Sequence, residues 1–142
     1  MRTLQRRVFT GGFPSLAEIA RFVAQATKSA GLGDRAAYAV QVAVDEACSN
    51  IIQHAYGGEG IGPIDCSCEV THDSLIITLR DEGRPFDPSL VSDPELGVEL
   101  EKRALGGLGV YLIRQLMDAV DHRYEPGIGN VLTLVKSREA GP

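Results

Sequence analysis

The stretch Val44–Tyr56 constrains the fold of this chain more than any other, because it predicts one helix with two different faces. On one face Glu46, Asn50 and His54 recur every four residues, so a carboxylate, an amide and an imidazole lie in a row. The adjoining face repeats apolar residues at three- and four-residue intervals, namely Val40, Val44, Ala47, Ile51 and Ala55. A helix with such a stripe buries it against another layer of the fold, which we expect to be a sheet.

The polar row has two interpretations when this stretch is taken alone. Surface helices normally carry a polar face, so a solvated face is the commoner outcome for a row of this kind. A carboxylate one turn from an amide also suits a hydrated Mg²⁺ ion, because hard cations take oxygen ligands and the amide of Asn50 adds no charge beside phosphate groups. The second interpretation predicts a Mg²⁺-nucleotide site.

Size and charge limit the class of protein. The 142 residues fit a single domain, residues 1–142, with enough buried surface to need no disulfide or metal for stability. Because the net charge is −5, we expect no direct binding to nucleic acid. The longest apolar stretches fall far short of the roughly 20 residues that span a bilayer, and no signal-peptide block follows Met1. We therefore expect no membrane insertion and a cytoplasmic location.

The cysteines are Cys48, Cys66 and Cys68, an odd number, and the C-x-C pair lacks the second ligand pair of a zinc site. Cys66 and Cys68 alternate along an expected strand, so both thiols point the same way. We expect free thiols in a reducing compartment.

Apolar periodicity and turn residues divide the chain into strands and helices in a definite order. The expected elements are a strand at 3–10, a helix to about residue 30, a second helix with the polar row, strands at 64–70 and 75–80, a helix after 106–109, and strands at 119–124 and 131–136. Ser15 with Glu18 predicts a capping box for the first helix, and Asp34 is expected to cap the second. The order predicts an α/β protein, a two-layer sandwich with a mixed, mostly antiparallel sheet and helices on one face.

Two further segments carry groups that a nucleotide requires. Asp81 follows a strand and precedes Gly83, so its carboxylate can accept a hydrogen bond from the exocyclic amine of adenine while glycine lets the ligand approach the backbone. The run Gly106-Gly107-Leu108-Gly109 opens a helix whose free amides can bind phosphate, and the irregular segment before it, about 88–106, is expected to be a lid. Alone, D-x-G is most often a turn, and the glycine run is neither a dinucleotide-binding loop nor a P-loop.

Taken in order, the three segments resemble the GHKL ATPase superfamily with its Bergerat fold, and most closely the anti-sigma-factor serine kinases of the RsbW and SpoIIAB type. Residues 46–56 (EACSNIIQHAY) are similar to their N-box, 81–87 (DEGRPFD) to their D-x-G-x-x-F box, and 107–113 (GLGVYLI) to their G-x-G-hydrophobic box. The family usually has Gly-Thr before its last strand, where this chain has Gly129 and Asn130.

The resemblance implies roles for individual residues. Glu46 would be the general base that orients or deprotonates a serine hydroxyl in line with the γ-phosphate of ATP. Asn50 would coordinate Mg²⁺. The residues expected to contact the nucleotide are Asn50, His54, Asp81, Gly83, Phe86, Gly106, Gly107, Gly109 and Asn130.

The function implied by the resemblance is that of an ATP-dependent protein serine/threonine kinase acting as an anti-sigma factor or partner-switching regulator. It would phosphorylate a STAS-domain anti-anti-sigma protein, alternately bind a sigma factor or another effector, and form a homodimer. The alternative is a non-catalytic module in which the nucleotide only sets the lid conformation and hence the bound partner. A third possibility, the detached ATP domain of a histidine kinase, is disfavoured because no phosphoacceptor helix is expected before the domain.

Overall fold

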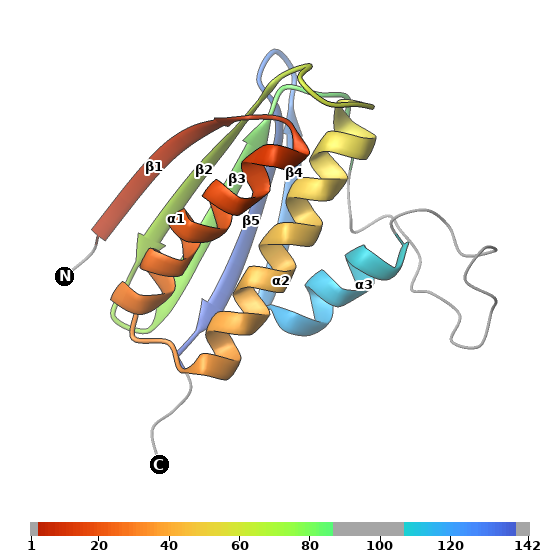
Figure 1. Ribbon diagram of the computed structural model, residues 1–142. Coiled ribbons are helices and arrows are strands. Elements are labelled where there is room, and N and C mark those ends of the chain that lie inside the picture. The colour runs from red at the N-terminus through yellow and green to blue at the C-terminus, as the bar shows by residue number, and fades with distance from the viewer. Residues whose placement is uncertain (1–2, 87–106, 139–142) are drawn as a thin grey trace.

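The computed structural model describes residues 3–86 and 107–138, which form an antiparallel sheet with helices on one face (Figure 1). In chain order the elements are β1 (Thr3–Thr10), the 3-10 turn η1 (Phe13–Ser15), α1 (Leu16–Ser29), α2 (Asp34–Asn50), the π-helical turn η2 (Ile51–Ala55), β2 (Pro63–Val70), β3 (Ser74–Asp81), α3 (Gly107–Leu116), β4 (Ala119–Glu125) and β5 (Gly129–Ser137). The expected α/β sandwich with helices on one face is confirmed, but the sheet expected to be mixed is purely antiparallel among the described strands. The expected lid, at about residues 88–106, lies outside the described residues.

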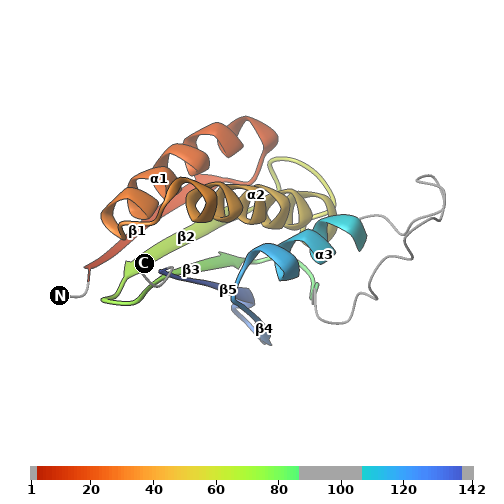
Figure 2. The ribbon, with the colours of Figure 1, turned by 90° about the horizontal axis from the view of Figure 1, so that it is seen from below.

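The strand order is β1-β2-β3-β5-β4, and every neighbouring pair among the described strands is antiparallel. Seen from below, α2 lies between α1 and α3, so it covers the middle of the sheet (Figure 2). The expected stripe on α2 explains this position, because its small and aliphatic side chains allow close packing on the strands and on both helices. The C-terminal end of α2 therefore reaches the sheet edge where β3 ends and β5 begins.

Alternation along the strands sends every second side chain into the core between the two layers. On β3 the buried row is Leu75, Ile77 and Leu79, and on β5 it is Leu132 and Leu134. Burying each such side chain stabilises the fold by about 1.5–3 kcal/mol. Both rows end in polar residues at the same edge of the sheet, as the next section describes.

The starts of the two long helices differ from the expected caps. Ser15 has helical backbone angles (φ −75°, ψ −15°) and no capping hydrogen bond, because the Pro14 turn already continues into α1. The backbone N–H of Phe13 instead donates to Glu59 Oε1 at 2.8 Å. At α2 the residue before the first turn is Gly33, and Asp34 is the first helical residue. Ser15 is thus the N-cap residue of α1, as predicted, but the predicted capping box was wrong, and so was the prediction of Asp34 as a cap.

The three cysteines are free and buried, as expected. Burial, with a smaller contribution from the charge of Asp45, raises the pKa of Cys48 to about 12. This thiol is therefore an apolar core group at neutral pH. Among the described residues, none of the helices combines the length and hydropathy that crossing a membrane requires.

Candidate functional site

A pocket lies where the end of α2 meets the ends of β3 and β5. Its polar wall is formed by Asn50, Asp81, His122 and Asn130. Apolar side chains complete it, among them Ile51, Phe86, Ile113 and Leu132. Asn50 from one predicted motif and Asp81 and Phe86 from a second therefore line the same pocket. Its free volume is about 20 Å³, room for about one water molecule, so a base can enter only if the lining side chains move.

Asp81, the last residue of β3, is 4% exposed. The backbone N–H of Gly83 and the side-chain Nδ2 of Asn130 both donate to its Oδ1, each at 2.9 Å. Burial raises the pKa of Asp81 above its ordinary value, while those two hydrogen bonds and the nearby imidazole of His122 act in the opposite direction. No described residue donates to Oδ2. The carboxylate is thus held by one oxygen and can offer the other to an amine.

Asn130 uses its full hydrogen-bonding capacity within the protein. Its Nδ2 donates to Asp81 Oδ1 and to the carbonyl oxygen of Arg84 at 2.8 Å. Its Oδ1 accepts from the backbone N–H of Phe86 at 3.0 Å and from His122 Nε2 at 2.8 Å. Two donors and two acceptors are all that an amide offers. The side chain, 3% exposed, therefore joins β4 and the segment 84–86 to Asp81.

Two glycines allow the backbone segments around Asp81 to approach closely. Gly129 has φ +124°, and a Cβ there would lie 1.9 Å from the carbonyl oxygen of Asp81. A Cβ on Gly83 would lie 2.5 Å from the carbonyl oxygen of Ala55. The glycine of the D-x-G motif therefore has a packing role against η2, in addition to the proposed approach of a ligand.

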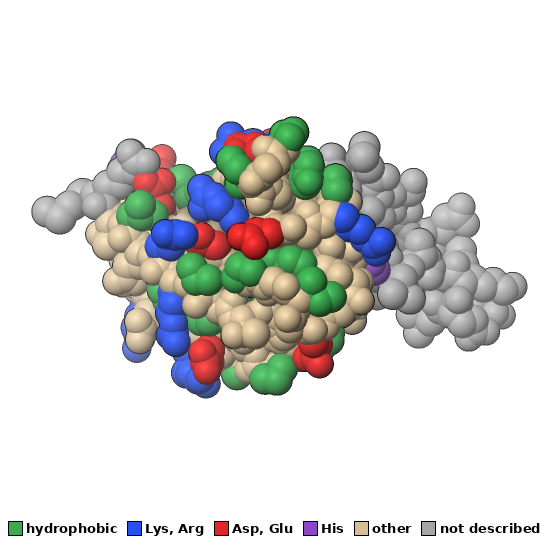
Figure 3. Space-filling model, turned by 90° about the horizontal axis from the view of Figure 1, so that it is seen from above, with side chains coloured by type: hydrophobic (Ala, Val, Ile, Leu, Met, Phe, Trp, Pro, Cys, Tyr) green, Lys and Arg blue, Asp and Glu red, His purple; other side chains and the backbone are tan. Residues whose placement is uncertain are grey.

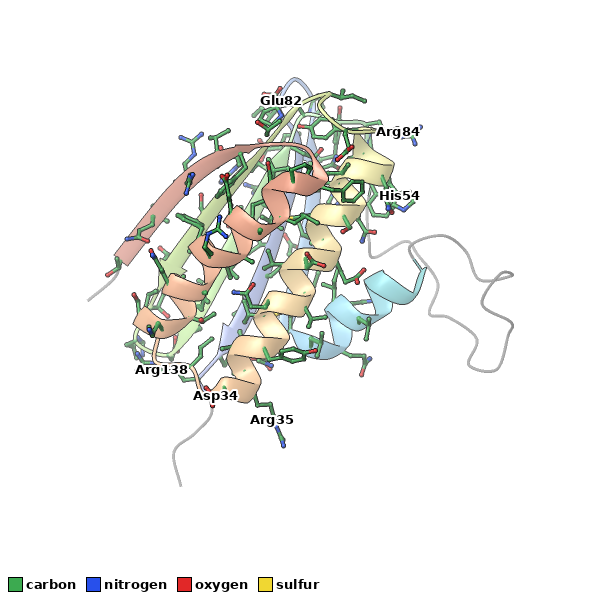
Figure 4. All side chains as sticks on the ribbon, viewed as in Figure 1. Asp34, Arg35, His54, Glu82, Arg84 and Arg138 are labelled. Carbon is green, nitrogen blue, oxygen red and sulfur yellow. The ribbon has the colours of Figure 1, made fainter. Side chains whose placement is uncertain are left out.

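The end of α2 is tied to the segment after β3 by hydrogen bonds. The π-helical turn η2 is closed by Tyr56 N–H donating to the carbonyl of Ile51 at 2.9 Å, and it leaves nearby carbonyls available. Arg84 donates through its Nε to the carbonyl of His54 (2.7 Å) and through its backbone N–H to that of Ala55 (2.9 Å). Figure 4 shows His54 and Arg84 beside each other at this end of the molecule. The uninterrupted α-helix expected between Asn50 and His54 is therefore corrected to a π turn.

Two polar side-chain atoms near the pocket are buried without a partner among the described residues, Asn50 Nδ2 and His54 Nε2. Asn50 is 5% exposed, and the ring of His54 stacks on Phe86 with centroids 5.0 Å apart. A buried polar atom without a hydrogen bond costs about 1–3 kcal/mol, so such atoms call for a ligand or water. The residues present therefore fit a polar ligand that reaches from Asp81 toward Asn50.

Of the remaining predicted residues, Glu46, Gly107 and Gly109 belong to the two helices beside this pocket. Glu46 is half-buried one turn before Asn50 on α2 and does not line the pocket. Gly107 and Gly109 are in the first turn of α3, which packs beside α2 and contributes Ile113 to the pocket. Gly106 lies outside the described residues.

Sequence reasoning missed His122. It lies on β4 opposite Leu132, two residues from Val120, which lies opposite Leu134. All four positions belong to the sheet face that the helices cover. The alternation of β4 in the sequence places His122 on the same face as Val120. A histidine at such an expected core position could have been recognised as a candidate site residue.

Comparison with known proteins shows which family this sequence belongs to. The histidine kinase-like ATPase domain family matches residues 14–136. The serine-protein kinase RsbW of Listeria innocua is 34% identical over 108 residues, which covers 73% of this chain and 69% of that protein. RsbW of Bacillus cereus strain AH187 is 33% identical over 120 residues, covering 78% of this chain and 74% of that protein.

The resemblance seen in the three motifs is thereby confirmed across most of the chain. The family match includes Glu46, Asn50, Asp81 and Asn130, and so contains every described polar residue around the pocket. The fold, the order of the motifs and the sequence identity agree with one another. This chain belongs to the histidine kinase-like ATPase family and, within it, to the serine-protein kinases of the RsbW type.

Proposed function

We propose that this protein is an ATP-dependent protein serine/threonine kinase that acts as an anti-sigma factor or partner-switching regulator. The observation that carries the proposal is the carboxylate of Asp81, held through Oδ1 in the wall of a largely apolar pocket, with no described donor on Oδ2. A carboxylate oriented in this way suits the exocyclic amine of adenine. The serine-protein kinases among the relatives support phosphoryl transfer as the reaction.

In this proposal the base enters between Asp81 and the apolar side chains of the pocket. Ile51, Phe86 and Leu132 would contact its faces, and the pocket would widen as Phe86 moves. Phe86 is not held by core packing alone, because its ring lies on the half-buried His54. Gly83 keeps the D-x-G segment against η2, and His54 lies at the rim.

The phosphates would extend from the base toward Asn50 and the first turn of α3. Gly107 and Gly109 lie in that turn, where backbone amides can bind phosphate oxygens. The unpartnered amide of Asn50 fits a role beside the phosphates, with its oxygen as a ligand of Mg²⁺. The metal would neutralise charge on the transferred phosphoryl group.

Glu46 is the proposed general base. It lies one helical turn from Asn50 and outside the lining of the base pocket, and in this proposal a serine of a second protein approaches the γ-phosphate beside it. Positioning and charge neutralisation account for most of the catalysis of phosphoryl transfer, so a carboxylate that orients the hydroxyl suffices.

The proposed substrate is the serine of a STAS-domain anti-anti-sigma protein, and the second partner is a sigma factor or another effector. A protein partner fits the end of the molecule where the pocket lies. Seen from above, apolar side chains gather there among charged ones (Figure 3). Phe13 of η1 is exposed, as are Ile61 and Ile128 on loops. We further propose that the protein works as a homodimer and in the cytoplasm, where ATP is available.

The test is a transfer assay with the full chain, Mg²⁺, γ-labelled ATP and a candidate STAS-domain protein. Glu46→Gln should abolish label on the partner serine while ATP binding, followed by calorimetry, stays within about twofold. Asp45→Asn is the matched control, because it removes the same charge from the exposed neighbouring position of α2. Nucleotide binding without transfer to any candidate would instead support the non-catalytic, nucleotide-gated module.

A further inference from the structure

We propose that His122 and Asn130 form a positioning relay that orients the carboxylate of Asp81 and thereby sets the preference of the site for purines with an exocyclic amine. This inference rests on the proposed nucleotide-binding function. It adds a residue that no motif contains, His122, and it gives Asn130 a role through Asp81 in place of the direct contact with the nucleotide that was first expected.

The relay runs across three adjacent strands. His122 on β4 donates from Nε2 to Asn130 Oδ1 at 2.8 Å, and Asn130 on β5 donates from Nδ2 to Asp81 Oδ1 at 2.9 Å. Asp81 and Asn130 are direct partners in the β3–β5 register, and His122 is opposite Leu132, two residues from Asn130. The three side chains thus lie on the same face of neighbouring strands, within reach of one another because the strands are hydrogen-bonded side by side.

The amide of Asn130 can take only one orientation here. The N–H of Phe86 is a donor and the carbonyl of Arg84 is an acceptor, so the amide oxygen must face Phe86 and the nitrogen must face Arg84. Because this oxygen can only accept, His122 Nε2 must carry the hydrogen of the bond between them. A flipped amide would place its oxygen against both the Asp81 carboxylate and the Arg84 carbonyl.

A second argument favours a role of Asn130 through Asp81 over a direct contact with the nucleotide. All four of its hydrogen-bonding positions are used inside the protein, so any bond to a ligand would require breaking one of them. Its effect on a ligand therefore passes through Asp81, whose Oδ2 faces no donor among the described residues. His122 adds a second donor that keeps the amide turned toward Asp81.

The expected effect is on selectivity and not only on affinity. A carboxylate fixed in one orientation accepts a bond from an amino group, whereas a purine without that group leaves it unpaired. If the relay is broken, Asp81 loses its orientation. The affinity for a purine with the amine then falls toward the affinity for a purine without it. Binding of a purine that lacks the amine should change little, because it never used that bond.

The experiment compares the dissociation constants of ATP and of purine riboside triphosphate, which lacks the 6-amino group, for the full chain in Mg²⁺. We expect the wild type to prefer ATP by about tenfold or more. In His122→Ala and in His122→Leu, which keeps side-chain volume, ATP binding should weaken about tenfold and analogue binding less than twofold. His122→Gln, whose amide can donate to Asn130, should restore most of the preference. His72→Ala, exposed on the β2–β3 turn, is the control.

The outcomes separate the relay from the proposed function. An equal loss for both nucleotides in the His122 variants, or an unchanged ratio, overturns the relay and leaves nucleotide binding intact. A wild type that binds neither nucleotide overturns the proposed function itself. Thermal unfolding of each variant shows whether it folds, and His122→Leu provides the comparison if His122→Ala is unstable.

Discussion

Asp81 and Asn130 face each other across β3 and β5 at positions where the alternation of both strands calls for apolar side chains. The residues below them in the same rows, Leu79 and Leu132, are also paired and are buried core residues. The site is therefore the polar end of the hydrophobic core. Desolvation at this position raises the pKa of Asp81. Hydrogen bonds are also stronger there than in water.

Replacing Asp81 with asparagine should weaken ATP binding and stabilise the protein in the absence of nucleotide. Burial raises the pKa of Asp81, so the ionised carboxylate disfavours the folded state at neutral pH. An amide has no charge and still accepts hydrogen bonds from Gly83 and Asn130. We expect a higher Tm at pH 7 and a loss of ATP affinity of about tenfold or more, measured by thermal unfolding and calorimetry.

The pH dependence of this stabilisation has a definite sign. A carboxyl whose pKa is raised by folding contributes stability below its ordinary pKa, and that contribution is lost as the pH rises through the raised value. The advantage of Asp81→Asn should therefore shrink as the pH falls through the same window, as measured by urea unfolding at a series of pH values. The exposed Asp121→Asn is the control. A constant advantage at all pH values would contradict this cause.

Replacing Asn50 with leucine should stabilise the protein without nucleotide and abolish its Mg²⁺-dependent binding of ATP. The buried Nδ2 of Asn50 has no partner in the described part of the chain, and an apolar side chain of similar size removes that cost. We expect the free energy of unfolding without nucleotide to rise by about 1 kcal/mol, and Mg²⁺-dependent ATP binding to be lost. Gln53→Leu, at an exposed position of η2, should show neither effect. Unchanged Mg²⁺-dependent binding would mean that Asn50 is not the metal ligand.

Local patterns were enough to predict most of the elements. The period-two alternation of β3 and the turn after Val70 identified the hairpin, and Thr71 does close that turn by hydrogen bonds to Ser74. The three-to-four-residue period of α2 identified its buried face. Both signals arise from residues close together in sequence, so they can be found without knowing the tertiary structure.

The features that sequence reasoning missed depend on distant residues. The π turn at Ile51–Ala55 leaves carbonyls that Arg84 binds, some 30 residues later. His122 and Asn130 lie on neighbouring strands, and Asp81 is on the next, because β5 lies between β3 and β4. This strand order cannot be predicted from local sequence patterns. Asn50, Asp81 and Phe86 were found because each lies in a motif, and their shared position at one pocket followed only from the fold.

Replacing Gly83 with alanine should separate the D-x-G segment from the end of α2. The new Cβ would lie 2.5 Å from the carbonyl oxygen of Ala55 and 2.6 Å from its carbon, so backbone must move. We expect a loss of about 1–3 kcal/mol in the free energy of unfolding, as for other overpacked sites, together with weaker ATP binding. Urea unfolding measures the first effect and calorimetry the second. Gly58→Ala, whose Cβ would make only an ordinary contact of 3.5 Å with Ile61 Cδ1, should change stability by less than about 0.5 kcal/mol. Equal costs at both positions would refute the close contact.

Tyr56 supports the site from outside the pocket, and removing its hydroxyl should loosen the segment that follows Asp81. Its Oη accepts from the backbone N–H of Glu82 at 2.9 Å and donates to the carbonyl oxygen of Pro63, so one side chain joins the end of α2 to β2 and to the D-x-G segment. Tyr56→Phe keeps the ring but leaves both backbone groups without this partner. We expect a loss of about 1–2 kcal/mol in the free energy of unfolding, measured by urea titration.

The same change should weaken ATP binding several-fold, because Asp81 and Gly83 lie on the segment that the hydroxyl holds. Tyr38→Phe is the matched control: that side chain is 72% exposed on α2, and its substitution should change stability by less than about 0.5 kcal/mol. If Tyr56→Phe behaves like Tyr38→Phe in both measurements, the hydroxyl does not hold the segment. If stability falls while ATP affinity stays the same, Tyr56 supports the fold without positioning Asp81.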